Sequence, residues 1–533
     1  MSQPSIAIVK TWLKECDAHA RCSAVHIVRS GWPSRLLSIG SAQQPLLCLI
    51  VPSPESDQPY VALSYCWGLK RQTTLLSSNK DAFSQSIMET ELPQTIKDTL
   101  YVARSLGFSY VWVDALCIIQ DDVGDWETEA AKMGQIYQNA SLTLCASRAS
   151  TVYEGFLGPR EPLVVYCGTI TQSDQPEARV LLSCRGAKRS AMDQVEGEPV
   201  TARGWCLQER LMSRRIVYYS DHQMMWQCVQ GAKQETGWDV TVVQKHMYDF
   251  ASGLRRSVDD TWRPECSVDT MWTDVVEEYS DRTLSRVTDR LPAMSGLALQ
   301  FKNVSANLQN RASHASTAGL DEDTYLAGHW LSALPYSLLW WPAGPGREIG
   351  YSTRARPSWS WIAVQCKVQF TEPTGYSNVA HVIDHHVRLS GSGTNPHGDV
   401  DECWLVLSAP VYWISLAAIT NMKRTDAVGS FVSEEVVPAV FAGKDIAFIA
   451  PDTALDRALL SVLIDPHYIP ERDDVGLLVL IRRLRFDFDA ASLEGILIAR
   501  SDDAPDTYTR AGLFTGLPNI AHEASTFSTI KLV

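Results

Sequence analysis

The sequence has no apolar run long enough to cross a membrane. Its longest runs, such as 46–51 and 476–481, fall far short of the roughly 20 residues that a bilayer core requires. Their length predicts buried strands instead. The N-terminus also lacks a basic segment followed by an apolar core and a cleavage site. We therefore expect a cytoplasmic protein that does not associate with membranes.

Basic residues are too few for sequence-independent binding to the phosphates of nucleic acid. Lys and Arg number 47 against 61 Asp and Glu, and the net charge of −14 is spread without long runs, so no nucleic-acid partner is expected. Phosphate-binding loops are also missing, since GxxxxGK[ST] does not occur. No repeat of fixed period is present, which excludes a solenoid.

Cysteine is present in an odd number, 13, scattered along the chain, and this distribution favours free thiols over a disulfide framework. Cys117, Cys145 and Cys228 lie within apolar runs, which is typical of reduced core thiols. Cys16-x2-His19-x2-Cys22 has the spacing of metal ligands, but the sequence identifies no fourth ligand. We interpret these three residues as packing residues, and no metal site is predicted.

What the sequence does contain is enough apolar mass, 45% of residues, for several cores. An N-terminal preamble (1–57) holds a helix around Trp12. An α/β block (58–230) follows, and then a helical connecting region (231–327). From 328 to 533, short apolar runs alternate with turn residues, which predicts an all-β C-terminal domain, a sandwich or an open barrel.

The α/β block has the order β-α-β-α-β. Its expected elements are a strand at 60–65, a helix from Pro93 to the C-cap Gly107, a strand at 109–114, a helix at 123–139 capped by Asp121 or Asp122, and a strand at 142–146. Strands joined through single helices pair in parallel by right-handed crossovers, so the sheet is expected to be mostly parallel.

A carboxylate on the second helix is the candidate catalytic residue. At about 100° per residue, Glu129 falls inside the apolar arc of the helix, whereas Glu127 falls on a polar side with Gly134 and Gln138. A carboxylate that faces a core is paired, hydrogen-bonded or raised in pKa, and a raised pKa makes a general acid or base. The structural alternative is that Glu129 accepts a hydrogen bond from a buried Arg or Trp, with Arg203 as the candidate partner.

Polar and aromatic residues follow the predicted parallel strands where ligands bind, beyond their carboxyl ends. They are Ser64, Tyr65, Trp67, Gly68 and Asp114. This combination suits a nucleotide-like small molecule held by stacking and hydroxyl hydrogen bonds, although the aromatics are equally compatible with a core. Further along, Glu209 shares a helix face with Trp205, where it reaches a polar pocket or forms a structural ion pair with Arg203.

Four segments resemble the fungal heterokaryon incompatibility (HET) domain over roughly residues 58–230. They are VALSYCWG (61–68), LPQTIKDTLYVARSLGFSYVWVDALCIIQDD (92–122), DWETEAAKMGQIYQNASLTLCAS (125–147) and RGWCLQERLMSRRIVYYS (203–220). The resemblance implies a fungal protein of non-self recognition, whose family triggers growth arrest or programmed cell death when incompatible hyphae fuse.

The HET domain is regarded as distantly similar to TIR domains, some of which cleave NAD⁺ at the nicotinamide–ribose bond. Residues 63–65 then look like part of the first TIR strand, and Trp126 with Glu129 looks like the catalytic helix, although the Glu follows the Trp by three residues instead of four. The resemblance implies a partial TIR-like fold and a hydrolase with NAD⁺ as substrate and no required cofactor. Its ligand-binding residues are the polar and aromatic set above together with Trp126, Arg203, Trp205 and Glu209.

Two other functions stay open from the sequence. One is a non-catalytic recognition or scaffold protein that assembles with a protein partner or with itself. The other is an enzyme of fungal secondary metabolism that uses the same pocket for another small molecule.

Overall fold

The computed structural model forms two compact units. Unit 1 comprises Met1–Asp260, Thr283–Ser285 and Ala293–Val304, and unit 2 comprises Thr261–Arg282, Arg286–Pro292 and Ser305–Val533. The residues that the structure describes are 3–23, 32–41, 45–53, 58–160, 165–170, 178–183, 195, 197–236, 239–240, 268–312, 323–343, 356–371, 375–391, 393, 395–415, 437–441, 444–451, 474–483, 492–501, 506–518 and 527–533. Part of the predicted helical region, 241–267, lies outside them.

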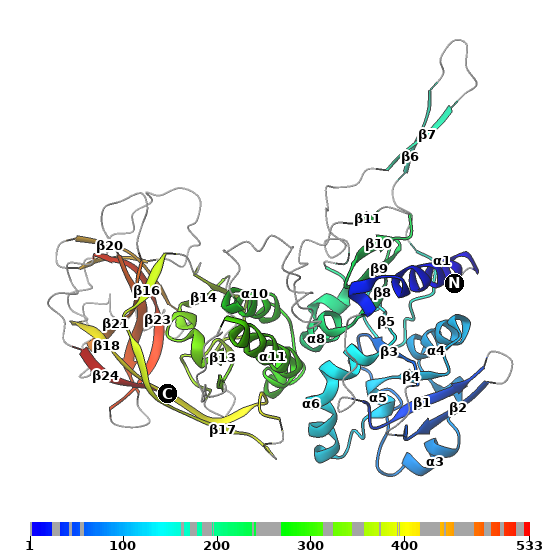
Figure 1. Ribbon diagram of the computed structural model, residues 1–533, viewed down its shortest axis with the longest axis horizontal. Helices are drawn as coiled ribbons and strands as arrows, with labels where there is room; N and C mark the ends of the chain where they lie inside the picture. Colours follow the sequence, from blue (N-terminus) through cyan, green and yellow to red (C-terminus); the bar gives the residue numbers. More distant parts are fainter. Residues whose placement is uncertain are drawn as a thin grey trace. The chain divides into compact units, whose positions relative to one another are not determined.

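A nine-stranded sheet forms the centre of unit 1 (Figure 1). In its middle, β3 (Tyr60–Ser64) pairs in parallel with β4 (Tyr110–Trp112) and β5 (Leu142–Cys145), and β5 pairs in parallel with β8 (Arg215–Tyr219). Antiparallel strands extend it on both sides: β1 (Leu36–Gly40), β2 (Pro45–Ile50), β9 (Met224–Cys228), β10 (Gly231–Gln234) and β11 (Asp239–Val240). The order is β11-β10-β9-β8-β5-β3-β4-β1-β2. The expected parallel sheet is confirmed for the centre.

The helix between β3 and β4 forms where its end signals predict. Helix α4 (Gln94–Leu106) starts directly after Pro93, whose fixed φ suits a helix start, and ends at Gly107 in the left-handed conformation, φ 94°. Its apolar residues Ile96, Leu100 and Ala103 are buried. This helix is the crossover that makes β3 and β4 parallel, so their carboxyl ends meet at one edge of the sheet.

Helix α6 (Val123–Asn139) is buried on more of its surface than the sequence predicts. Asp122 caps it by accepting a hydrogen bond from the Asp125 backbone N–H at 3.1 Å. Gly134 and Gln138, expected on a polar side, are both buried. That expectation was wrong because the Gly134 side of α6 packs against Gly296 in α11 (Ser295–Ala312), where a Cβ on Gly134 would lie 2.9 Å from the Gly296 Cα.

The predicted preamble contributes strands as well as a helix to unit 1. Helix α1 (Gln3–Asp17) contains Trp12, as expected, and α2 (Ala20–Ser23) follows it. Strand β2 lies on the predicted apolar run, but β1 was not predicted. Since β1 pairs with β4, the preamble belongs to the central sheet.

The remaining elements of unit 1 are short. They are α3 (Lys80–Gln85), α5 (Asp114–Cys117), α8 (Gly204–Met212), the antiparallel hairpin of β6 (Val165–Ile170) with β7 (Ala178–Ser183), and 3₁₀ turns at Glu89–Glu91 and Pro199–Ala202. None of the helices among the residues described above is long and apolar enough to cross a membrane.

Unit 2 is rich in β-strands, as predicted. Its helix α10 (Val268–Ser280) packs on β15 (Val368–Phe370). The other strands are β12 (Tyr325–Leu326), β13 (His329–Trp330), β14 (Trp340–Pro342), β16 (Tyr376–Asn378), β17 (His381–Leu389), β18 (Val400–Ser415), β19 (Val437–Phe441), β20 (Lys444–Pro451), β21 (Asp474–Arg483), β22 (Ser492–Arg500), β23 (Thr507–Pro518) and β24 (Phe527–Leu532). Strand pairings close a ring through β18, β21, β22, β23 and β24.

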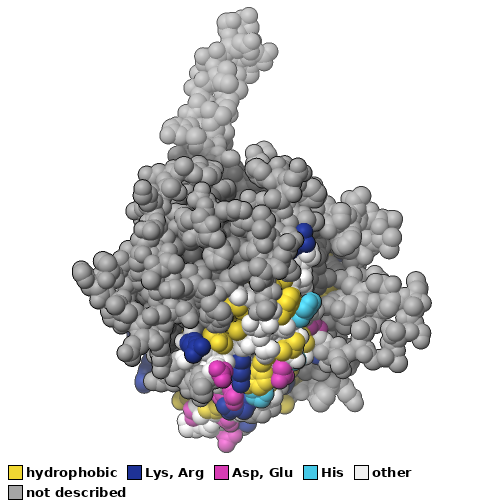
Figure 2. Space-filling model, turned by 90° about the vertical axis from the view of Figure 1, so that its left-hand side faces the viewer, with side chains coloured by type: hydrophobic (Ala, Val, Ile, Leu, Met, Phe, Trp, Pro, Cys, Tyr) yellow, Lys and Arg dark blue, Asp and Glu magenta, His cyan; other side chains and the backbone are white. Residues whose placement is uncertain are grey.

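The surface of unit 2 mixes residue types instead of gathering one kind. On β17 and β18, Arg388 lies 3.3 Å from Asp401 and 3.4 Å from Glu402, while the His386 ring stacks on Trp404. Figure 2 shows acidic, basic, His and apolar side chains interleaved on the described part of one face. The described part of this face gives no charged patch from which to argue a partner.

Candidate functional site

The carboxyl ends of β3 and β4 and the first turns of α8 bring together most of the residues predicted to bind a ligand. Strand β3 continues into Tyr65 and Trp67, β4 leads to Asp114, and α8 carries Arg203 at its N-cap and Glu209 two turns later. We call these five residues the edge cluster. It lies where the parallel topology predicts a ligand site.

Asp114 is held by the two aromatic residues of the cluster. The Trp67 indole N–H donates to Asp114 Oδ2 at 2.8 Å, and the Ala115 backbone N–H donates to Oδ1 at 2.7 Å. Burial raises the pKa of Asp114, while the hydrogen bonds from Trp67 and Tyr65 act in the opposite direction. The Tyr65 hydroxyl also accepts a hydrogen bond from Gln72 at 3.3 Å. Asp114 therefore fixes the orientation of both aromatic side chains.

Arg203 is the positive charge of the cluster. Its guanidinium donates to the Tyr65 carbonyl oxygen at 2.8 Å, and a parallel bridge with Thr283 fixes its backbone. Burial alone lowers the pKa of Arg203, but Cys206, Glu209 and the other acidic groups nearby outweigh this and raise it. Arg203 thus stays charged and is shared between the carboxylates of Glu209 and Asp114.

Glu209 is the second carboxylate of the edge cluster, and one of its oxygens has no hydrogen-bond partner. The side chain is 5% exposed, and its Oε2 is buried with no hydrogen-bond partner. Burial raises the pKa of Glu209 to about 7, with Asp114 adding to the rise and hydrogen bonding with Ser64 and attraction to Arg203 limiting it. A carboxyl group that titrates near neutral pH is suited to general acid or base catalysis.

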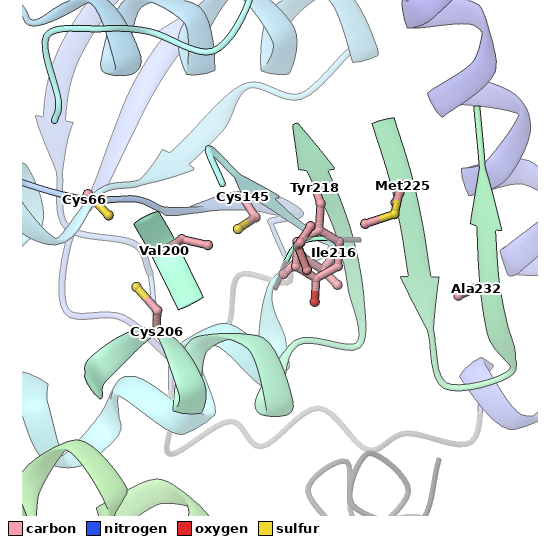
Figure 3. Close-up of a cluster of buried hydrophobic side chains, with 9 residues drawn as sticks. Cys66, Cys145, Val200, Cys206, Ile216, Tyr218, Met225 and Ala232 are labelled. Atoms are coloured by element: carbon pink, nitrogen blue, oxygen red, sulfur yellow. The ribbon is translucent and has the colours of Figure 1, made fainter. Parts of the chain in front are cut away.

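Three buried cysteines line one side of the cluster. Cys66 follows β3, Cys145 ends β5 and Cys206 lies on α8, in one hydrophobic group with Val200 (Figure 3). Burial raises the pKa of all three thiols, so they are neutral at physiological pH and are not thiolate nucleophiles. Like the other cysteines of the described chain, they are free, as the sequence predicts. They form an apolar surface that keeps the dielectric constant low around Glu209. We call Cys66, Cys145 and Cys206 the cysteine wall.

The other predicted binding residues border the cluster. Trp205 and Trp126 meet edge to face, with ring centroids 6.3 Å apart, and join α8 to α6. Gly68 has φ +76°, and a Cβ there would lie 2.8 Å from Thr151 Cγ2, so the turn after β3 requires glycine.

Glu129, the predicted catalytic residue, is fully buried as expected but belongs to a different group of side chains. Ser34 Oγ donates to its Oε1 at 2.5 Å, and Lys132 Nζ lies 3.5 Å from the same oxygen. The candidate partner Arg203 was wrong, because the cation beside Glu129 is Lys132. The Ser34 backbone N–H also donates to Oε2 at 3.4 Å, so Glu129 connects α6 to the segment before β1. The catalytic role of Glu129 stays a prediction, and the geometry favours Glu209 as the reactive carboxylate.

We expect Glu129→Gln to lower the free energy of unfolding by about 1–2 kcal/mol, because a charge-assisted hydrogen bond becomes a neutral one. Chemical denaturation of the purified variant measures this. Turnover equal to that of wild type would exclude the catalytic role predicted from the sequence.

Sequence reasoning missed Ser34, Gln72 and the cysteine wall as neighbours of the candidate residues. Ser34 and Gln72 lie in segments without periodicity, so nothing in the sequence places them beside Glu129 or Tyr65. Cys66 and Cys206 carried a weak signal, because each lies within two residues of a predicted site residue.

These features define an α/β domain with a buried, ionisable cluster at the carboxyl edge of its parallel strands. The family model for Heterokaryon incompatibility protein (HET) matches residues 60–209, a range that contains the whole edge cluster. The chain thus contains a heterokaryon incompatibility (HET) domain, and the domain supports a role in heterokaryon incompatibility or cell death. Searches of curated proteins and of solved structures gave no match.

Proposed function

We propose that the HET domain of this chain hydrolyses the nicotinamide–ribose bond of NAD⁺, and that this reaction is how it contributes to cell death. The observation that carries the proposal is Glu209, which is buried, has an unpartnered Oε2, and has a pKa that burial raises to about 7 in the presence of Arg203 and Asp114. Few other chemical groups are required, because the leaving nicotinamide is already cationic in the substrate.

The reaction breaks the bond between ribose C1′ and the pyridinium nitrogen. The bonding electron pair moves to nitrogen and neutralises its charge, which leaves an oxocarbenium-like ribose. Water then adds to C1′ and gives up one proton, so that NAD⁺ and water yield nicotinamide, ADP-ribose and a proton. A carboxylate near C1′ stabilises the cation and accepts the proton from water.

In this scheme ionised Glu209 is the stabilising carboxylate and base. The positive charge of Arg203 keeps the pKa of Glu209 below the value that burial alone would give. A substantial fraction of the Glu209 side chains is therefore ionised at neutral pH. Asp114 holds the Trp67 ring in place by accepting its indole N–H, so that the ring provides a fixed stacking surface. The cysteine wall limits the access of water, which strengthens the interaction between the carboxylate and the cation.

A second candidate is a non-catalytic recognition or scaffold role, and one observation favours it. Tyr65 is only 3% exposed, and Trp67 is hydrogen-bonded to Asp114, which is also how a purely structural cluster satisfies its polar groups. In that role the HET domain assembles with a protein partner or with another copy of the chain.

The two candidates are separated by incubating the purified full chain with NAD⁺ and following nicotinamide and ADP-ribose by mass spectrometry. We expect equimolar products that accumulate in proportion to protein. An unlabelled metabolite extract in a parallel reaction reveals any other small-molecule substrate, as the secondary-metabolism alternative requires. If NAD⁺ is stable while the chain oligomerises with a partner, the scaffold role replaces the enzymatic one.

A further inference from the structure

Four residues that the edge cluster does not use converge on the opposite side of unit 1. Cys16 lies in the last turns of α1, His19 follows that helix, Cys22 lies in α2, and Cys228 is the last residue of β9. Their four ligand atoms, one from each side chain, all lie within 4.8 Å of one another, and the three cysteines are buried. The fourth ligand that the sequence did not identify is therefore Cys228, 209 residues beyond His19.

The distances within this group match those of a tetrahedral zinc site. His19 Nδ1 lies 3.6 Å from Cys22 Sγ and 3.7 Å from Cys228 Sγ. Zinc bonds of about 2.3 Å to sulfur and about 2.0 Å to nitrogen, separated by the tetrahedral angle, place ligand sulfur and nitrogen about 3.5 Å apart.

A positive charge lies beside the group. Arg215 hydrogen-bonds to Cys16 and also donates to Asp17 Oδ1 at 2.7 Å, so a guanidinium lies beside the first ligand. Three thiolates and a neutral imidazole around Zn²⁺ carry a net charge of −1, which Arg215 balances.

We propose that Cys16, His19, Cys22 and Cys228 bind one Zn²⁺ as a structural site. All four positions are filled by protein ligands, so no position is left for water or substrate, as in other structural zinc centres. The ion joins the N-terminal helices to β9 near the edge of the central sheet, where Trp12 already packs on Trp226 and Lys233 pairs with Glu15. This site is independent of the proposed function.

The test is the metal content of the full-length chain, purified under reducing conditions without chelator and measured by plasma mass spectrometry. We expect one zinc per chain. Cys228→Ser and His19→Ala should each lose most of it, whereas His19→Cys, which keeps four zinc-binding ligands, should retain it. Cys48→Ser is the matched control, because Cys48 lies in the same unit on β2 and is not part of the group.

Two further measurements keep the proposal falsifiable if a variant fails to fold. Chelation of zinc from the wild-type chain should lower its Tm, and added zinc should restore it. Cobalt in place of zinc should give the intense visible bands and thiolate charge-transfer band of a tetrahedral site. A wild-type chain that binds neither metal after reduction overturns the proposal. So does a thiol titration under denaturing conditions that shows Cys16, Cys22 or Cys228 in a disulfide.

Discussion

Glu209→Gln is expected to reduce NAD⁺ turnover by about 10²–10⁴-fold, the usual effect of removing a general acid or base. The amide keeps the size of the side chain but neither carries charge nor accepts a proton. Because Glu209 acts as the ionised form, wild-type kcat/KM should rise with pH and level off above about 7, the pKa to which burial raises this group. Product formation at several pH values, measured on both proteins, checks both expectations.

The same substitution should stabilise the fold at high pH, which separates loss of chemistry from loss of structure. The pKa of Glu209 is about 7 in the folded chain against 4.5 as its ordinary value, so between these values the folded state binds more protons than the unfolded state. The free energy of unfolding therefore falls as pH rises from 4.5 to 7, in total by roughly 3 kcal/mol. Glu209→Gln removes this titratable group and with it the loss of stability at high pH. The variant should therefore have a higher free energy of unfolding than wild type at pH 8, and the difference should vanish at pH 4.

Glu198→Gln is the matched control for both measurements. Glu198 is another buried carboxylate of unit 1 with an unpartnered Oε2 and a pKa raised by burial, but it is not part of the edge cluster, and its Oε1 accepts the Asp221 backbone N–H at 3.0 Å. Its substitution should leave turnover unchanged. If Glu209→Gln and Glu198→Gln cleave NAD⁺ equally well, Glu209 is not the reacting group.

Local signals explain why so much of the α/β block is predictable from sequence. Pro93 and Gly107 bound α4, and Asp122 caps α6, each through interactions within a few residues. Strand β1 has no such signal. It is five residues long, and only its pairing with β4, more than seventy residues later, makes it part of the sheet. Long-range pairing of this kind is not encoded in local periodicity.

The candidate site shows the same difference between what local signals predict and what long-range contacts determine. The helical periodicity of α6 correctly buries Glu129, but it carries no information about Ser34 as a partner. The parallel topology places Tyr65, Trp67 and Asp114 at one edge, because strand ends follow from strand order. The pKa of Glu209, which burial raises to about 7, depends on surrounding side chains that come from distant segments, such as Ser64 and Asp114.

Gly134→Val should destabilise unit 1 by about 3 kcal/mol or more, because the added side chain has nowhere to go. A Cβ at Gly134 would lie 2.9 Å from the Cα of Gly296, so the obstacle is backbone and cannot rotate away. The Gly296 backbone N–H also donates to Gln208 Oε1 at 2.7 Å, and Gln208 precedes Glu209 on α8. Moving α11 away from α6 thus removes a constraint on the reactive carboxylate, and turnover should fall together with stability.

Gly124→Ala, on the same helix, should instead raise the free energy of unfolding. Gly124 is exposed in the first turn of α6, and its added Cβ meets only the Asp122 side chain at 3.5 Å. Replacing an exposed helical glycine by alanine stabilises a helix by up to about 1 kcal/mol. Thermal unfolding of the two variants beside wild type therefore distinguishes close helix packing from a general intolerance of α6 to substitution. If both variants shift Tm in the same direction, the contact between Gly134 and Gly296 does not limit stability.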